Sequence, residues 1–202
     1  MALTDKLKAI ADAIRSKTGS TESMTLDQMA TEISNISTGG SIEEPYVIET
    51  YDSAGNLIEA ELVGQTKIRN NFFNGCSKLA LTSLPSGITT IGDFAFKECS
   101  NLALTSLPSG VTSICQYAFS GCSKLALTSL PSGVTSIDAH AFYSCKSLTS
   151  ITFEGTPSSI SSVAFRYCSN IVTINVPWAE GAVADAPWGA TNATINYNYT
   201  GE

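Results

Sequence analysis

The sequence has a single histidine and no long hydrophobic run, and each scarcity removes a class of function. No stretch approaches the roughly 18 consecutive apolar residues of a membrane-spanning helix, so we expect no membrane insertion. The first residues, MALTDKLKAIADAIRSK, carry charges at regular intervals and lack the apolar centre of a signal peptide. We therefore expect synthesis in the cytoplasm, with any location outside the cell reached by lysis or by assembly into a larger particle.

Positive charge is also scarce. Eleven Lys and Arg stand against 18 Asp and Glu, which gives a formal net charge of −7. Residues 1–67 hold five basic and eleven acidic side chains, a balance of −6, whereas residues 68–182 hold six and five. Nucleic-acid binding needs a basic stripe along the phosphates, and the sequence has none, so we expect no nucleic-acid partner.

The usual catalytic motifs are missing as well. No P-loop, G-x-S-x-G, H-E-x-x-H or G-x-G-x-x-G is present, and acidic residues are not paired at matching positions. A Cys–His nucleophile would need His140 beside Cys145 or Cys115, together with a third group that orients the imidazole. We expect no catalytic residue, no metal site and no cofactor, and hence no enzyme.

What the sequence does contain is a repeat of 23 residues. The octapeptide ALTSLPSG occupies residues 80–87, 103–110 and 126–133. Five complete units follow one another without a gap, at 68–90, 91–113, 114–136, 137–159 and 160–182. Each unit has a cysteine at its ninth position, which gives Cys76, Cys99, Cys122, Cys145 and Cys168.

Apolar residues recur at fixed positions of the unit, with Ile at the first, Phe at the sixth and mostly Leu at the twelfth and seventeenth. So short a unit cannot bury these side chains alone, but stacked units would bury them as ladders inside a solenoid. The predicted core ladder of the second and third units is Ile91, Phe96, Cys99, Leu102, Leu107, Ile114, Phe119, Cys122, Leu125 and Leu130.

Local chemistry predicts the shape of one coil. The T-S-L segment favours a short strand that a proline ends, the following S-G supplies a turn, and V-T-S-I favours a second short strand. The x-x-A-F-x-x-C segment is too short for a helix and is interpreted as a single helical or 3₁₀ turn. The predicted fold class is a repeat solenoid with short parallel strands and single helical turns.

The pattern C-S-x-L-x-x-T-S-L-P-S-G-V-T-S-I-x-x-x-A-F-x-x-C resembles the BspA-like leucine-rich repeats of bacterial surface proteins and phage-encoded proteins. The resemblance covers residues 68–182 and implies a scaffold whose exposed positions choose the partner.

The cysteine spacing matches no zinc site, which needs close C-x₂₋₄-C pairs. Stacked cysteines would have parallel Cβ vectors, so a ladder of small, buried, reduced thiols is favoured over disulfides. Cys115 lies off the ladder at a variable position and is therefore expected to be more exposed and the thiol most open to reaction.

Residues 1–36 show two amphipathic helical patterns, of which the second begins with a capping box between Thr25 and Gln28. We expect this helical pair to anchor or oligomerise the chain, through Leu3, Leu7, Ile10, Ile14, Leu26, Met29 and Ile33. The motif L-x-x-I-A-D-A-I-R-x-K-T-G followed by L-D-Q-M resembles the leader of tail and virion proteins of Firmicutes phages.

Residues 37–45 are predicted to be a polar linker, and residues 46–67 a β-hairpin that caps the N-terminal end of the solenoid. Residues 183–202 are predicted to form a C-terminal cap with a last strand near Ala193–Tyr199. Trp178 and Trp188 suit that cap, with sugar stacking as the weaker alternative.

The most variable unit positions carry a row of aromatic and charged side chains. We interpret them as a candidate binding ridge for a protein or glycan, although an ordinary solvated ridge is the simpler alternative. Its residues are Phe94, Lys97, Tyr117, His140, Tyr143, Arg166 and Tyr167.

The favoured function is a non-enzymatic virion component of the tail-fibre or tip type, which displays the solenoid for assembly or host-surface recognition. Its expected partners are other virion proteins or itself, as a homo-oligomer, and a host cell-surface protein or glycan. The alternative is a bacterial surface or secreted adhesion module.

Overall fold

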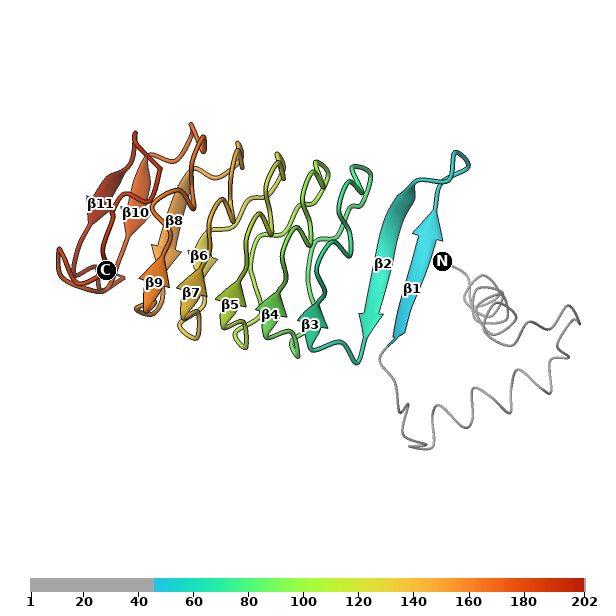
Figure 1. Cartoon of the computed structure of the whole chain (residues 1–202), viewed down its shortest axis with the longest axis horizontal. Coiled ribbons are helices and arrows are strands. Elements are labelled where there is room, and N and C mark those ends of the chain that lie inside the picture. The colour runs from blue at the N-terminus through green and yellow to red at the C-terminus, as the bar shows by residue number, and fades with distance from the viewer. Residues whose placement is uncertain (1–45, 202) are drawn as a thin grey trace, which may run out of the picture.

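The computed structural model describes residues 46–201. Over this range the chain winds into a rod of stacked coils, with a hairpin at one end and the C-terminus at the other (Figure 1). The solenoid of parallel strands that the 23-residue spacing predicts is confirmed. The predicted helical pair at 1–36 and the linker at 37–45 lie outside the described residues.

One side of the rod is a five-stranded parallel sheet in the order β3-β4-β5-β7-β9. Its strands pair in strict 23-residue register, with Ile68 opposite Ile91 and Ile91 opposite Ile114. Each strand is only two residues long because the chain turns inward directly after the buried isoleucine. The strands are β3 (Lys67–Ile68), β4 (Thr90–Ile91), β5 (Ser113–Ile114), β7 (Ser136–Ile137) and β9 (Ser159–Ile160).

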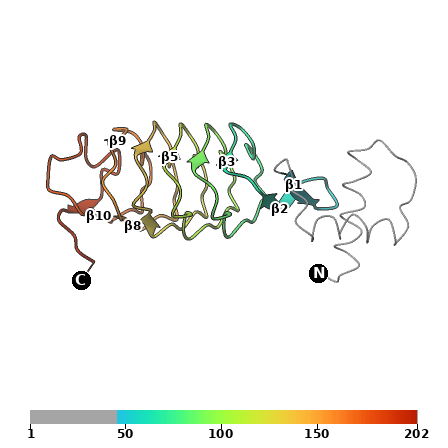
Figure 2. The ribbon, with the colours of Figure 1, turned by 90° about the horizontal axis from the view of Figure 1, so that it is seen from below.

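The opposite side carries a four-stranded parallel sheet in the order β11-β10-β8-β6, and Figure 2 shows the two sheets facing each other across the rod. The strands are β6 (Ser129–Leu130), β8 (Ser150–Phe153), β10 (Thr173–Asn175) and β11 (Thr194–Asn196).

The strand predicted at each T-S-L segment is wrong for the first two units. Among the described residues, strands on this side begin only at β6, in the third unit. Proline at the eighteenth position is the cause, since Pro108 and Pro131 have no N–H to donate. In the fourth unit Glu154 stands there instead, and its N–H donates to the carbonyl of Leu130 at 3.0 Å, which lengthens the ladder.

The predicted helical turns are also wrong, since residues 46–201 contain no helix and therefore none that could span a membrane. In the A-F-x-x-C segments the backbone donors alternate between two kinds of bond. The N–H groups of Ala95 and Lys97 close turns within the coil, whereas those of Phe94 and Phe96 donate to the next coil. A helix would use every N–H internally and leave none for stacking.

The core is built from the repeated apolar positions. Every residue of the predicted core ladder is buried, and the phenylalanines stack with ring centroids 5.0 to 5.5 Å apart from Phe73 to Phe165. Burial of five large rings in one column contributes to the hydrophobic stabilisation of the coils, with the Ile and Leu ladders.

The ladder cysteines are free thiols with a specific partner. The Sγ atoms of Cys99, Cys122 and Cys145 each donate to the carbonyl of the ladder phenylalanine one coil earlier, at 2.9 to 3.1 Å. Cys76 is the exception to the predicted burial and is half-buried, because no repeat unit precedes the first one.

The N-terminal hairpin consists of antiparallel β1 (Tyr46–Tyr51) and β2 (Leu57–Val63). Ile58 in β2 accepts a hydrogen bond from the N–H of Ala80, and Ala60 and Leu62 are buried against the first coil. The hairpin therefore covers the end of the solenoid that is opposite to β10 (Figure 2).

At the other end both tryptophans are buried, with exposed fractions of 6% for Trp178 and 0% for Trp188. Their rings contact each other and the ring of Phe153, and Nε1 of Trp188 donates to the carbonyl of Ala184 at 2.7 Å. They close the apolar end of the rod, so their faces are not available to a sugar.

Candidate binding surface

Every residue of the predicted ridge lies along one edge of the rod, where the turn segments of successive coils stack. We call this set the aromatic ridge. It comprises the rings of Phe94, Tyr117, His140, Tyr143 and Tyr167 and the cations Lys97 and Arg166. The sequence placed these residues at variable positions, and the fold brings them into a continuous chain of contacts.

The first three rings form a parallel stack. The ring centroids of Phe94 and Tyr117 are 5.2 Å apart with planes at 9°, and those of Tyr117 and His140 are 4.7 Å apart at 6°. All three side chains are half-buried. Because the faces of these rings meet each other, the stack presents ring edges rather than ring faces to a partner.

The geometry changes beyond His140. Tyr143 tilts at 57° to the histidine, and Tyr167 meets Tyr143 edge to face at 86° with centroids 5.1 Å apart. Tyr167 is 55% exposed, so it ends the ridge with a ring that is largely open to solvent.

Two cations lie on the rings. Nζ of Lys97 is 5.6 Å from the centroid of Phe94 and 5.9 Å from that of Tyr117, while the guanidinium carbon of Arg166 is 5.1 Å from that of Tyr167. All three distances suit cation–π attraction. The ridge therefore combines aromatic edges with positive charge.

The backbone beneath the ridge is left-handed. Phe94, Tyr117 and His140 have φ of 56°, 54° and 60°, and Tyr167 has φ of 63°. In the first coil the same position as Phe94 is held by Asn71, with φ of 59°. Asparagine tolerates this conformation, whereas an aromatic side chain there costs about 1–2 kcal/mol. The fold therefore permits aromatic side chains here but does not require them.

His140 is placed as a stacking residue. Its Nδ1 is buried and has no hydrogen-bond partner among residues 46–201, so nothing in that range orients the ring as a base. Within the same residues no group of three or more His, Cys, Asp or Glu side chains is able to hold a metal ion.

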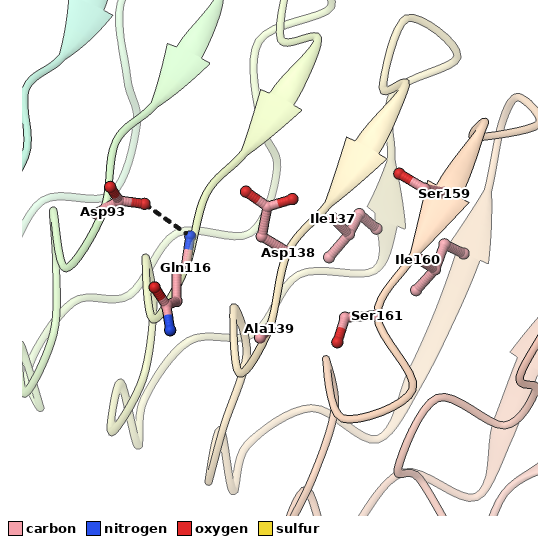
Figure 3. Close-up of a pocket in the computed structure, with 8 residues that line it drawn as sticks. All are labelled: Asp93, Gln116, Ile137, Asp138, Ala139, Ser159, Ile160 and Ser161. Atoms are coloured by element: carbon pink, nitrogen blue, oxygen red, sulfur yellow. Dashed lines mark hydrogen bonds between the residues drawn. The ribbon is translucent and has the colours of Figure 1, made fainter.

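A hollow of ≈ 510 Å³ lies on the side of the five-stranded sheet, and its lining includes Asp93, Gln116 and Asp138 (Figure 3). Asp93 is occupied in holding coils together. Its Oδ1 accepts the N–H of Gln116 at 3.1 Å, and its own N–H donates to Oδ1 of Asn70 at 2.9 Å. Burial, with the charge of Asp93, raises the pKa of Asp138. Asp93 thus links successive coils, and we assign a ligand to neither acid.

Cys115 is half-buried, so its thiol is less exposed than a surface residue and more exposed than the buried ladder thiols. Burial raises the pKa of its thiol, and the carboxylates of Asp138 and Asp93 raise it further. Cys115 is thus more exposed than the four buried ladder thiols, as expected, but its environment disfavours the reactive thiolate, so its reactivity rests on access and not on activation.

One feature of the surface was missed by the sequence interpretation. A hollow of ≈ 360 Å³ lies between Tyr167 and the C-terminal cap and includes Ser169, Thr191 and Asn192. It exists because the loop after Trp188 folds against the fifth coil, where the N–H of Phe165 donates to the Trp188 carbonyl at 2.9 Å. The only sequence signal was Gly189, whose φ of 90° and close approach to Arg166 allow no side chain.

Stacked coils with two parallel sheets, in-register ladders and an exposed variable edge define a leucine-rich-repeat type of solenoid scaffold. The chain belongs to the BspA-type leucine-rich repeat family, whose model matches residues 64–180 in six copies. The 23-residue spacing had given five complete units within nearly the same range.

Three solved structures of leucine-rich proteins are similar to this chain. A leucine-rich repeat protein of T. pallidum shares 24% identity with this chain, and the match covers 75% of this chain and 78% of that protein, with a TM-score of 0.53. A leucine-rich repeat protein from Bacteroides ovatus shares 24% identity, 66% and 46% coverage and a TM-score of 0.38. A leucine-rich cell surface protein from Faecalibacterium prausnitzii shares 20%, with 66% and 54% coverage and a TM-score of 0.40.

The first of these likenesses shows the fold alone. A comparison with curated proteins found no match.

Proposed function

We propose that this chain is a non-enzymatic recognition module that binds a partner on a cell surface through the aromatic ridge. The observation that carries the proposal is the placement of Phe94, Tyr117 and His140 in left-handed backbone where asparagine would fit with less strain. Backbone strain that the fold does not need is a reason to look for function. The ridge is rigid, aromatic and positively charged, as a binding surface requires.

We place this module in a virion, as a tail-fibre or tip component. The support is the resemblance of residues 1–36 to the leader of phage tail and virion proteins. In this proposal residues 1–36 attach the chain to other virion proteins or to further copies of itself, and the solenoid projects toward the host. Its location is then the virion, or the medium after lysis.

A bacterial surface or secreted adhesion module is the second candidate. The observation in its favour is membership of the BspA-type family, because repeats of this type resemble those of bacterial surface proteins. The ridge would serve the same purpose in either setting, so the two candidates differ in what carries the module and not in how it binds.

The test of recognition is a variant that removes the ridge and keeps the backbone. In Phe94→Asn/Tyr117→Asn/His140→Asn each ring is replaced by the residue that the first coil already uses at this position, Asn71. The fluorescently labelled full chain is added to a panel of Firmicutes cells and to mammalian epithelial cells. We expect the unaltered chain to bind one of these and the variant to bind at least tenfold more weakly.

The melting temperature of the variant should stay close to that of the unaltered chain, because relief of strain offsets the lost stacking. As a matched control, Thr82→Asn, Ser106→Asn and Thr105→Asn together place three asparagines at exposed sites outside the ridge. Equal binding by the ridge variant and the unaltered chain would contradict the proposal.

The setting is tested by immunogold labelling of the strain that carries the gene. Gold on particles released after prophage induction supports the virion. Gold on the walls of uninduced cells supports the surface module.

A further inference from the structure

We propose that the hollow at the C-terminal end of the aromatic ridge binds an acidic pyranose, such as a uronic or sialic acid residue of a surface glycan. This inference rests on the proposed recognition function and gives that function a chemical class of ligand. It concerns Tyr167, Arg166, Ser169, Thr191 and Asn192.

The first step is the availability of a ring face. Sugars bind aromatic rings through their C–H faces, and the faces of Phe94, Tyr117 and His140 meet one another. Tyr143 is in edge-to-face contact with Tyr167. The Arg166 guanidinium lies over one face of the Tyr167 ring, and at 55% exposure Tyr167 is the ring of the ridge with the most surface left for a ligand.

The second step is the lining. Tyr167 is the single aromatic residue at a hollow of ≈ 360 Å³, and the other named lining side chains end in hydroxyl, amide or guanidinium groups. One ring face together with several polar groups suits a ligand that has one apolar face and a rim of hydroxyls.

The third step is an unused backbone donor. At the eighth position of the preceding coils, the N–H of Glu98, Gly121 and Ser144 donates along the rod to the next coil. Tyr167 holds this position in the last coil, and within residues 46–201 its N–H has no such acceptor. The hollow lies where that acceptor would be, so an oxygen of the ligand takes its place.

The fourth step is charge. The Arg166 guanidinium donates to Oη of Tyr167 at 3.4 Å, and its remaining N–H groups are left for a ligand. A guanidinium recognises a carboxylate with two parallel hydrogen bonds, which favours an acidic over a neutral sugar. The lining of the hollow contains no acidic residue that would oppose a carboxylate.

The hollow is preformed. The cap loop is held by the bond from Phe165 to Trp188 and by the bond from Ala190 to Pro187, both 2.9 Å long. A Cβ at Gly189 would lie 2.9 Å from the backbone nitrogen of Arg166, so the cap loop lies directly on the fifth coil. Little ordering is therefore needed on binding.

The test uses two sugars that differ only at C6, methyl β-glucuronide and methyl β-glucoside. Saturation-transfer NMR on the full chain detects contact, and titration gives the dissociation constant. We expect both sugars to receive saturation and the glucuronide to bind about tenfold tighter, the ratio expected of one charge-assisted contact.

Three variants locate the site. Tyr167→Asn keeps a residue that tolerates the left-handed backbone and should abolish transfer to both sugars. Arg166→Gln should remove the preference for the glucuronide and leave the glucoside unchanged. Tyr51→Asn, at a tyrosine on β1 that is 53% exposed, is the matched control and should change neither. Thermal melting verifies that each variant is folded.

Absence of transfer to either sugar would overturn the inference, as would undiminished binding by folded Tyr167→Asn or equal affinity for both sugars. These failures are separable from failure of the proposed function. If no sugar binds but the triple ridge variant still loses cell binding, recognition stands and the partner is a protein.

Discussion

At the scale of single residues, the molecule is built from side chains that contact their own copies one coil away. Phe119 lies between Phe96 and Phe142, with centroid distances of 5.5 Å on both sides. The ladder cysteines are stacked on one another in the same way, and their thiols donate to backbone carbonyls instead of forming disulfides. Each ladder therefore restricts its members to one size and one chemistry.

Thiol labelling tests this arrangement. On the native chain we expect maleimide to react only at Cys76 and Cys115, which are half-buried. The other four thiols are buried, and burial raises the pKa of Cys99 to about 12, so they should react only after unfolding. Mass spectrometry in native and denaturing buffer should count two and then six adducts. Fewer than six adducts after unfolding without reductant would reveal a disulfide and contradict the ladder.

Asp138 gives a pH-dependent prediction. Its folded pKa is raised from 3.8 by burial and by Asp93, so the folded state binds the proton more tightly than the unfolded chain. The charged form is therefore destabilising, and its effect grows as the pH rises through the folded pKa. Asp138→Asn should stabilise the protein at pH 7 by no more than about 0.5 kcal/mol, since solvent screens this exposed side chain.

At pH 2.5 the same substitution should have no effect, because Asp138 is then protonated in both states. Denaturant unfolding at the two pH values measures the difference. A loss of stability at pH 7 would contradict the assigned cause of the shift.

At the scale of elements, the coil depends on how closely successive turns approach. In the S-G turns of the first three units a Cβ at Gly110 would meet only the carbonyls of Ile88 and Ser86 at 3.5 Å. In the fourth unit the turn is different, and a Cβ at Gly155 would lie 2.3 Å from the Ser132 carbonyl oxygen. There is therefore room for a Cβ at Gly110, whereas there is none at Gly155 in the altered unit.

Alanine substitution separates the two turns. Gly155→Ala should destabilise the protein by about 2 kcal/mol or more, because backbone atoms must move. Gly110→Ala is the matched control and should be neutral or stabilising by up to about 1 kcal/mol through the unfolded chain. Chemical denaturation of both variants measures this, and equal losses would show that the clash at Gly155 is relieved elsewhere.

At the scale of the whole molecule, the solenoid is a stack whose ends must be covered. The hairpin of β1 and β2 lies at one end, and the two tryptophans and β11 lie at the other (Figure 1). Since each coil contacts only its neighbours, stability is close to a sum of coil and interface contributions, and a lost cap exposes a whole layer.

Trp188→Ala tests the C-terminal cap. Trp188 is completely buried, and truncation should destabilise the protein by about 3–5 kcal/mol. Val172→Ala, at a side chain that is 60% exposed in the same end of the rod, should change stability by less than about 0.5 kcal/mol. Thermal unfolding compares the two, and similar melting temperatures would mean that Trp188 does not hold the cap.

Residues 1–36 give a prediction about assembly. If they oligomerise the chain, light scattering should find the full chain as an oligomer and a chain that starts at Ser41 as a monomer, with unchanged circular dichroism in the β region. Two monomers would contradict oligomerisation by these residues alone.

The sequence determined the solenoid, its register and its core, because a strict repeat leaves one way to bury identical apolar positions. Ile91, Phe96, Cys99 and Leu102 could be assigned to the interior from spacing alone, and all four are fully buried. The residues of the ridge could be named in the same way, because they occupy the positions that vary between units.

Only the tertiary structure decided which surface those variable residues present to a partner. Contact between Phe94 and Tyr117 closes ring faces that the sequence leaves open, and the fold of the cap over the fifth coil makes Tyr167 the exposed ring beside a hollow. Spacing predicts which residues share a position in the repeat. Ring orientation and the hollow depend on contacts between the last coil and a segment outside the repeat, and no periodicity encodes those.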